Sequence, residues 1–243
     1  MKNLVTLIWR SPQLSTGDIS RDSSLMGYVS QALRGQGVGV YEMREDQKLP
    51  QADVYVSMAR SGKMLSELEA RERSGALVIN ATSAVRLCLN RRELERRLRE
   101  GDVDVPGEYN GEGPCWLKFN SMAGHVTFAH NADGLEQLKL SLRHHGICDW
   151  VVSPHVIGRH VKFYGVAGTD FFQAYCISPD SLRKQAEEAA RLTGITVYGG
   201  DAIVREDGSS CIVDFNDWPS FSPCMEEAAE VIAECIVKRM SEK

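Results

Sequence analysis

The segment from Gly200 to Pro219, GDAIVREDGSSCIVDFNDWP, constrains the fold of this chain more than any other. Two apolar runs flank Asp207-Gly208, and this pattern is a strong signal for a β-hairpin with a two-residue loop. Such a loop fixes which residues face each other along the two strands. The predicted ladder begins with Glu206 opposite Ser209 and continues with Arg205 opposite Ser210.

The same register predicts a cluster of polar side chains. Counted outward from the turn, Asp201 lies opposite Asp214, and cross-strand partners share one face of a sheet. Asn216 points the same way as Asp214 because it lies two residues further along the strand. Two carboxylates side by side in apolar surroundings repel each other, and a divalent cation removes the repulsion. Carboxylate and amide oxygens favour Mg²⁺ or Mn²⁺ over zinc. Alternatively, Asp214 and Asn216 cap the turn at residues 217–219.

A lysine in the interior of a predicted strand is a second candidate. Lys118 belongs to the apolar run CWLKFN, although lysine is depleted in strand interiors. The loop that follows contains Ser121 and Gly124, and small residues let backbone N–H groups approach phosphate oxygens. The alternative is an edge-strand lysine that prevents aggregation.

A further hairpin is predicted around Gly158-Arg159, with glycine where a type II′ turn requires it. Its register pairs Lys162 with His155, which indicates an anion pocket, or else a surface lysine with its stem on apolar neighbours.

Gly62-Lys63 lacks P-loop spacing. It lies between a strand and a helix N-terminus, a position suited to an acidic substrate group.

The order of the predicted elements indicates an α/β (α+β) protein. The first part alternates strands and helices as β-α-β-β-α-β, which predicts a small domain with a largely parallel sheet. Ser23 and Ser24 are expected to cap its first helix. A single helix is predicted over 83–99, and antiparallel strands dominate the second half. The strands are predicted at 4–9, 38–43, 53–58, 76–79, 115–119, 126–129, 150–157, 160–167, 171–176, 198–205 and 210–215.

Composition excludes some classes of protein. Lys and Arg number 28 against 33 Asp and Glu, a net charge of −5, so the basic face of a nucleic-acid binder is not expected. No apolar run approaches the ~20 residues of a membrane span, so no membrane partner is expected. The 7 cysteines are odd in number and none has CxxC spacing, which predicts a reduced, cytoplasmic protein. The oligomeric state is left open.

Taken together, these motifs resemble the ATP-grasp superfamily, and most closely its ribosomal-protein glutamate ligase and inositol polyphosphate kinase branches. The resemblance rests on Lys118, the Ser/Gly loop, the segment VVSPHVIGRHVKFYGVAG, and then GGDAIV and IVDFNDWPSFSP. It implies an N-terminal α/β domain over 1–79, and then an ATP-grasp fold of two α+β subdomains, 80–155 and 156–243, that clamp a nucleotide.

The resemblance also implies roles for individual residues. Lys118 and Lys162 would act in catalysis, touching the nucleotide phosphates and the acylated intermediate. Arg91 or Arg92 would be a basic phosphate contact, and backbone near Ser153 and His155 would meet the adenine. Ser121 and Gly124 complete the implied nucleotide site. Asp201, Asp214 and Asn216 would hold one or two Mg²⁺ (or Mn²⁺) ions.

The implied activity is ATP-dependent ligation of a carboxylate to an amine or thiol through an acyl phosphate. The substrates would be small-molecule or peptide carboxylates and amines. A small-molecule kinase, in which a hydroxyl takes the phosphoryl group directly, and a nucleotide-binding module without catalysis are the alternatives. Trp9, Arg10, Arg60, Ser61 and Trp218 are candidates for the acceptor pocket, although each has a plain structural explanation.

Overall fold

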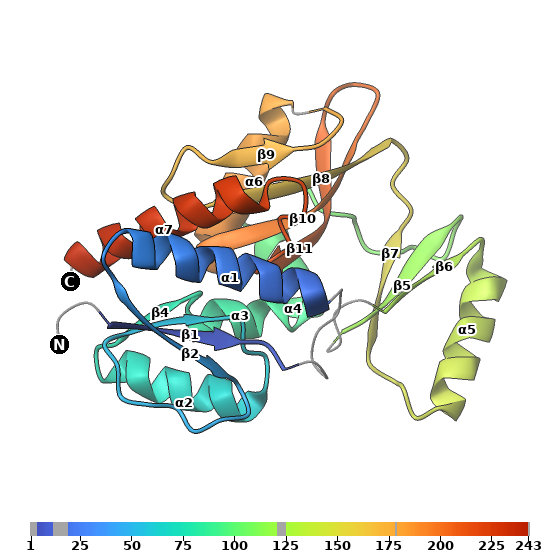
Figure 1. Ribbon diagram of the computed structural model, residues 1–243. Coiled ribbons are helices and arrows are strands. Elements are labelled where there is room, and N and C mark those ends of the chain that lie inside the picture. Colours follow the sequence, from blue (N-terminus) through green and yellow to red (C-terminus); the bar gives the residue numbers. More distant parts are fainter. Residues whose placement is uncertain (1–3, 12–18, 121–124, 178, 243) are drawn as a thin grey trace.

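The computed structural model describes residues 4–11, 19–120, 125–177 and 179–242. Its first unit is a four-stranded parallel sheet in the order β2-β1-β3-β4, as the alternating pattern predicted (Figure 1). The elements are β1 (Leu4–Trp9), α1 (Ile19–Gly35), β2 (Gly39–Arg44), β3 (Val54–Ser57), α2 (Gly62–Arg73) and β4 (Leu77–Ile79). The expectation that Ser23 and Ser24 cap the first helix was wrong, because α1 begins at Ile19 and includes both serines.

Two short helices replace the single helix predicted over 83–99. They are α3 (Thr82–Cys88) and α4 (Arg91–Glu100). Asn90 separates them with extended backbone, and its side chain caps α4 by accepting a hydrogen bond from the Glu93 N–H at 3.2 Å. Asn at the N-cap with Glu three positions later is a helix start signal, so the break was readable in the sequence.

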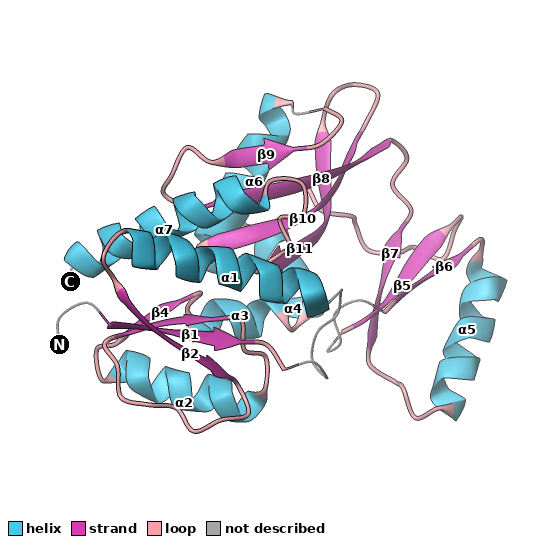
Figure 2. Cartoon of the chain, in the orientation of Figure 1, coloured by secondary structure: helices cyan, strands magenta, loops and turns pink. Residues whose placement is uncertain are grey.

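The central unit is a small antiparallel sheet with one helix. It contains β5 (Cys115–Phe119), β6 (Val126–Ala129), α5 (Ala132–His144) and β7 (Trp150–Pro154), with the strands in the order β6-β5-β7. The edge-strand explanation for Lys118 was wrong, because β5 is the middle strand of this sheet. The unit has a core of its own around Leu117 and Leu135, and it stands apart from the two larger sheets in Figure 2.

The last unit is a four-stranded antiparallel sheet in the order β11-β10-β8-β9. Its elements are β8 (Arg159–Val166), β9 (Phe172–Ala174), α6 (Asp180–Thr193), β10 (Val197–Val204), β11 (Ser210–Asp217) and α7 (Met225–Ser241). Helix α6 packs its apolar side on one face of the sheet, with Leu182 and Ala186 against Phe163 and Ala202.

The hairpin predicted at Gly158-Arg159 was wrong. Strand β7 pairs with β5, and β8 pairs with β10 and β9, so the two strands belong to different sheets. Gly158 has φ +154°, and a Cβ there would lie 2.4 Å from the Val204 carbonyl oxygen. Glycine is therefore required for a linker that passes close to β10, rather than for a hairpin turn.

The parallel sheet and the last sheet share one hydrophobic core. Leu25 and Leu33 of α1 lie in the same buried cluster as Ile232 and Ile236 of α7, and the two helices run side by side in Figure 1. Asn80, just after β4, adds a polar connection: its amide oxygen accepts from Thr196 N–H (2.9 Å) and Val197 N–H (2.8 Å), and its Nδ2 donates to Val197 O (2.9 Å). The domain boundaries at 79 and 155 remain a prediction.

Candidate active site

The last hairpin brings Asp201 opposite Asp214, as predicted, although by a different route. The loop is one residue longer than expected: Arg205 N–H donates to Ser209 O, and Val204 rather than Arg205 pairs with Ser210. This is the three-residue type of hairpin loop, with Gly208 in the left-handed region at φ +80°. A register shift between Asp201 and Ala202 then restores the predicted pairing.

The register shift is a β-bulge at Val213, and the bulge has a partner. Ala202 pairs with Ile212 and Asp201 with Asp214, so Val213 is the extra residue on β11. Its carbonyl oxygen accepts a hydrogen bond from Lys118 Nζ at 2.7 Å. The bulge thus provides a direct contact between β5 of the central sheet and β11 of the last sheet.

Glycines before Asp201 allow the strands to approach. A Cβ on Gly200 would lie 2.1 Å from Asp214 O, and one on Gly199 would lie 2.7 Å from both Phe163 O and the Pro219 ring. A side chain at Gly200 would push β11 away from β10, and one at Gly199 would collide with β8 and with Pro219. The GGD sequence is therefore a steric requirement for bringing the two aspartates together.

Asp214 is ionised in this environment and has both oxygens engaged. Oδ1 accepts from Arg91 Nη1 at 2.6 Å, and Oδ2 accepts from Asn216 Nδ2 at 2.7 Å. Burial raises the pKa of Asp214, but the charge of Arg91, the Asn216 hydrogen bond and Lys118 outweigh burial and hold this pKa below its ordinary value. These partners, rather than the turn at residues 217–219, account for the orientation of the side chain.

Asp201 lies beside two basic side chains of β8. Its Oδ1 contacts Lys162 Nζ at 2.9 Å and His160 Nε2 at 2.7 Å. Burial lowers the pKa of Lys162, but the hydrogen bond and charge of Asp201 outweigh it and raise this pKa overall. The predicted pairing of Lys162 with His155 was wrong, because the cross-strand partner of Lys162 is Asp201. His160 was missed, and the alternation of β8, which places it on the face of Lys162, was the available signal.

Lys118 is held in a buried position between the sheets. Beyond its bond to Val213, its Nζ lies 3.7 Å from Glu95 Oε1 of α4, and its side chain is 7% exposed. Burial lowers the pKa of Lys118, and Glu95 and Asp214 only partly offset this effect. A buried ammonium next to two carboxylates is suited to meeting an anionic ligand.

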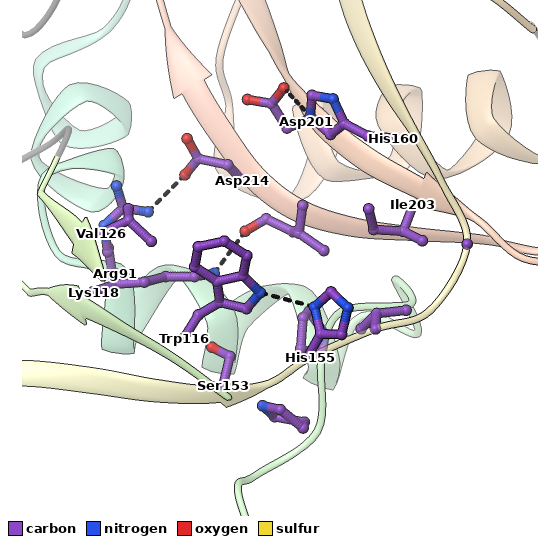
Figure 3. Close-up of a pocket in the computed structure, with 15 residues that line it drawn as sticks. Arg91, Trp116, Lys118, Val126, Ser153, His155, His160, Asp201, Ile203 and Asp214 are labelled. Atoms are coloured by element: carbon purple, nitrogen blue, oxygen red, sulfur yellow. Dashed lines mark hydrogen bonds and ion pairs between the residues drawn. The ribbon is translucent and has the colours of Figure 1, made fainter. Parts of the chain in front are cut away.

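Most of these groups line one cavity of about 440 Å³ between the central sheet and the last sheet (Figure 3), whereas Lys162 and Asn216 lie behind its lining, in contact with Asp201 and Asp214. One end carries the ionisable side chains Arg91, Lys118, His160, Asp201 and Asp214. The rest of the lining is largely apolar and consists of Pro106, Trp116, Val126, Ser153, Pro154, His155, Val156, Gly158, Ile203 and Val213. Trp116 Nε1–H donates to His155 Nδ1 at 3.1 Å.

The two candidate arginines on α4 differ in position. Arg91 lines the cavity, with a side chain 10% exposed. Arg92 is 62% exposed and donates to Asp149 Oδ1 (3.0 Å) and Trp150 O (3.1 Å). Ser121 and Gly124 lie outside the described residues, so their predicted contacts with phosphate remain predictions.

The predicted anion position at the start of α2 adjoins one of the protein's own carboxylates. Glu45 accepts hydrogen bonds from the backbone N–H groups of Ser11 (2.6 Å), Arg60 (3.0 Å) and Ser61 (2.8 Å). Glu45 thus occupies the N–H groups just before α2, and an acidic substrate group at this helix N-terminus remains a prediction. A helix N-terminus favours any carboxylate, and the sequence did not reveal that Glu45 folds back onto it.

Two proposed acceptor-pocket residues pair with the end of β11 instead. Arg60 Nη2 donates to Asp217 Oδ1 at 2.6 Å, and Arg10 Nη2 lies 3.8 Å from Asp217 Oδ2. The Asp217 side chain is 0% exposed. Trp218 is buried at 1% exposure with φ +44°, so it belongs to the core. This ion-pair cluster joins the parallel sheet to the residue that follows Asn216.

The donor set at the charged end fits a hard divalent cation. Asp201 and Asp214 offer carboxylate oxygens in one cavity, and Asn216 adjoins Asp214. Oxygen donors of this kind suit Mg²⁺ or Mn²⁺. Within the described ranges, no three His, Cys, Asp or Glu side chains cluster as metal ligands, so a third protein ligand would have to be the amide.

No known family's sequence model matches the chain, and no curated protein matches it. Solved structures do. A RimK domain ATP-grasp protein from Sphaerobacter thermophilus superposes with a TM-score of 0.70 at 19% identity, covering 96% of this chain and 99% of the other. D-alanine–D-alanine ligase from Bacillus anthracis has a TM-score of 0.73 at 12% identity, covering 98% and 97%. The ATP-grasp ligase PsnB with its minimal precursor has a TM-score of 0.68 at 15% identity, and the superposition covers 98% of this chain and 99% of PsnB.

These three structures share one architecture, and this chain has it as well: the fold is that of the ATP-grasp proteins. The expected fold class is thereby confirmed. No helix in the described part of the chain is long and apolar enough to cross a membrane.

Proposed function

We propose that the protein is an ATP- and Mg²⁺-dependent ligase that joins a carboxylate to an amine or thiol through an acyl phosphate. The observation that carries this proposal is the cavity itself, in which two carboxylates, an arginine, a lysine and a histidine lie together in an otherwise largely apolar lining. The D-alanine–D-alanine ligase of the same fold has been crystallised with ATP, which supports a nucleotide as the occupant. The cytoplasmic location expected from the cysteine pattern remains part of the proposal.

Each group has a role in the proposed chemistry. The apolar end receives the base near Ser153 and His155, and Arg91, Lys118 and Lys162 contact the phosphates. Asp201, Asp214 and Asn216 would hold Mg²⁺, which supplies charge neutralisation and orientation of the phosphate oxygens when bound. A substrate carboxylate oxygen forms a bond to the γ-phosphorus as the bond to the β-phosphate oxygen breaks and ADP leaves.

The second step exchanges phosphate for the nucleophile. An amine or thiol attacks the acyl carbon, inorganic phosphate leaves, and the nucleophile loses a proton to solvent. Lys118 and Lys162 stabilise the negative charge that develops on the transferred group. Such chemistry depends on positioning and electrostatics more than on a general base. The proposed substrates are a small-molecule or peptide carboxylate and an amine. Two proteins of this fold support this class: one is named a D-alanine–D-alanine ligase, and the other, PsnB, has been crystallised with a precursor peptide.

An isotope experiment tests the reaction. A panel of ¹⁸O-labelled carboxylates is incubated with ATP and Mg²⁺, with and without amines, and the inorganic phosphate is analysed by mass spectrometry. A ligase transfers one ¹⁸O atom to phosphate, and phosphate release depends on both substrates. A phosphorylated hydroxyl product without phosphate release would instead establish the kinase alternative. Tight ATP binding without turnover on the whole panel would support the non-catalytic module.

The proposed phosphate contact of Lys118 makes its own prediction. Lys118→Met is expected to weaken ATP binding about tenfold or more, because a charged hydrogen bond to phosphate is lost. AMP, which lacks the distal phosphates, should lose much less. Isothermal titration calorimetry with ATP and AMP measures both affinities. Lys139→Met, on exposed α5, is the matched control and should change neither. Equal losses for ATP and AMP would remove Lys118 from the distal phosphates.

A further inference from the structure

Arg91 combines an ion pair with unused hydrogen-bonding capacity. It is the first residue of α4 and is fixed there by the Asn90 cap. Its Nη1 donates to Asp214 Oδ1 at 2.6 Å, whereas its Nε is buried with no hydrogen-bond partner among the described residues. A buried donor without a partner is costly, and a guanidinium has five N–H groups. Arg91 is therefore positioned to gain further acceptors from a ligand in the cavity.

Arg91 also forms an ion pair with Asp214, one of the proposed metal ligands. Both oxygens of Asp214 are engaged, one by Arg91 and the other by Asn216. A divalent ion that binds Asp214 through Oδ1 competes with the guanidinium, and one that binds through either oxygen is repelled by the Arg91 charge 2.6 Å from this carboxylate. Asp201 has a similar competitor in Lys162, but its Oδ2 carries no contact from the described residues, so an ion can bind Asp201 without displacing a partner.

The charges of the cluster balance before any ligand is counted. Three carboxylates (Glu95, Asp201, Asp214) face three cationic side chains (Arg91, Lys118, Lys162), which sum to zero with His160 neutral. A divalent ion alone makes this partly buried cluster positive, and a triphosphate alone makes it strongly negative. The two together leave a smaller charge than the triphosphate alone, so electrostatics favours their joint binding.

We propose that Arg91 is an exchange residue: it leaves Asp214 for the nucleotide phosphates as the divalent ion takes Asp214. The inference rests on the proposed nucleotide site and assigns it a regulatory property. In the absence of nucleotide, Arg91 suppresses binding of the divalent ion. In its presence, the phosphates withdraw Arg91 from the carboxylate, so metal and nucleotide strengthen each other's binding.

The test measures metal binding without catalysis. Mn²⁺ affinity is determined by electron paramagnetic resonance, with and without a non-hydrolysable ATP analogue. The wild-type protein is expected to bind Mn²⁺ at least about tenfold more tightly when the analogue is present, after the binding of Mn²⁺ by free analogue, measured without protein, is subtracted. Arg91→Met is expected to bind Mn²⁺ alone about tenfold more tightly than wild type, to bind the analogue more weakly, and to lose most of the coupling.

Two further variants secure the interpretation. Arg92→Met, next along α4 but paired with Asp149 outside the cavity, should behave as wild type. Arg91→Lys keeps the positive charge, so the affinity for Mn²⁺ without the analogue should stay as low as in wild type. This result would distinguish an effect of the charge from an effect of altered packing. The unfolding temperatures of all variants are compared first. If Arg91→Met is unstable, Arg91→Lys still tests the coupling between Mn²⁺ and the analogue. This coupling should be weaker than in wild type, because a lysine has fewer hydrogen-bond donors than an arginine.

The inference is overturned if Mn²⁺ and the analogue bind wild type independently, or if Arg91→Met leaves the affinity for Mn²⁺ alone unchanged or weaker. These results differ from failure of the proposed function, in which wild-type protein binds no nucleotide with or without the metal. Metal and nucleotide that bind tightly without coupling would leave the proposed function standing and remove the exchange.

Discussion

Asp214→Asn is expected to abolish metal-dependent binding of ATP while the protein stays folded. The substitution keeps the size of the side chain and leaves an amide oxygen that Arg91 can still reach, and a turn of the Asn216 amide lets its oxygen accept from the new amide group. It removes the charge that makes the oxygen a ligand for a divalent ion. Loss of even an outer-shell partner of a metal typically costs 10–100-fold in affinity, so we expect a loss of about a hundredfold or more for this residue.

The measurement is calorimetric titration of ATP in Mg²⁺ and in excess chelator, with far-UV circular dichroism as the check on folding. Asp207→Asn, in the exposed turn of the same hairpin, is the matched control and should bind as wild type does. If Asp214→Asn binds Mg²⁺ and ATP with wild-type affinity, Asp214 is not a metal ligand and the assignment of the charged end has to be abandoned.

Asp217→Ala is expected to destabilise the protein by about 3–5 kcal/mol, the usual effect of removing one partner of a buried ion pair. Its carboxylate is fully buried against Arg60 at 2.6 Å, with Arg10 at 3.8 Å. Without Asp217, two guanidinium groups with side chains only 4% and 7% exposed lose a shared counter-charge. Arg10 and Arg60, which both follow strands of the parallel sheet, would then repel each other and lose their ion pairs with the end of β11.

Urea denaturation followed by tryptophan fluorescence measures this effect. Asp170→Ala is a suitable comparison, because Asp170 is fully exposed and its ion pair with Arg183 spans 4.0 Å. A pair of this kind contributes between ~0 and ~1 kcal/mol. Equal stability of the two variants would mean that the Asp217 cluster does not join the sheets.

Local signals in the sequence predicted a large part of this fold. The apolar periodicity located the strands and most helices, and one hairpin placed Asp201 opposite Asp214. That result held although the loop is one residue longer than predicted, because the bulge at Val213 compensates. The break at Asn90 was also present in the sequence as a capping pattern, which the continuous charged run concealed.

Contacts between distant segments could not be predicted in this way. β7 and β8 are neighbours along the chain, and their apolar patterns are compatible with a hairpin, yet each finds its partner in another sheet. The pairing of Arg60 with Asp217 spans more than half the chain, and that of Arg91 with Asp214 spans half of it. Such ion pairs depend on the final packing of the sheets, because no periodicity or spacing encodes them.

The three hydrogen bonds of Asn80 have a mechanical consequence. They tie the end of β4 to the start of β10 as a strand's own backbone would, and the shared core of α1 and α7 reinforces the connection. The larger part of the molecule therefore moves as one rigid body. The small sheet around β5 has its own core and is joined to this body by the linkers before β5 and after β7, by Lys118, and by the hydrogen bonds of α4 with Asn120 and Asp149. Because Asp201 and Asp214 belong to the larger body, any displacement of the small sheet changes the width of the cavity without separating the two aspartates.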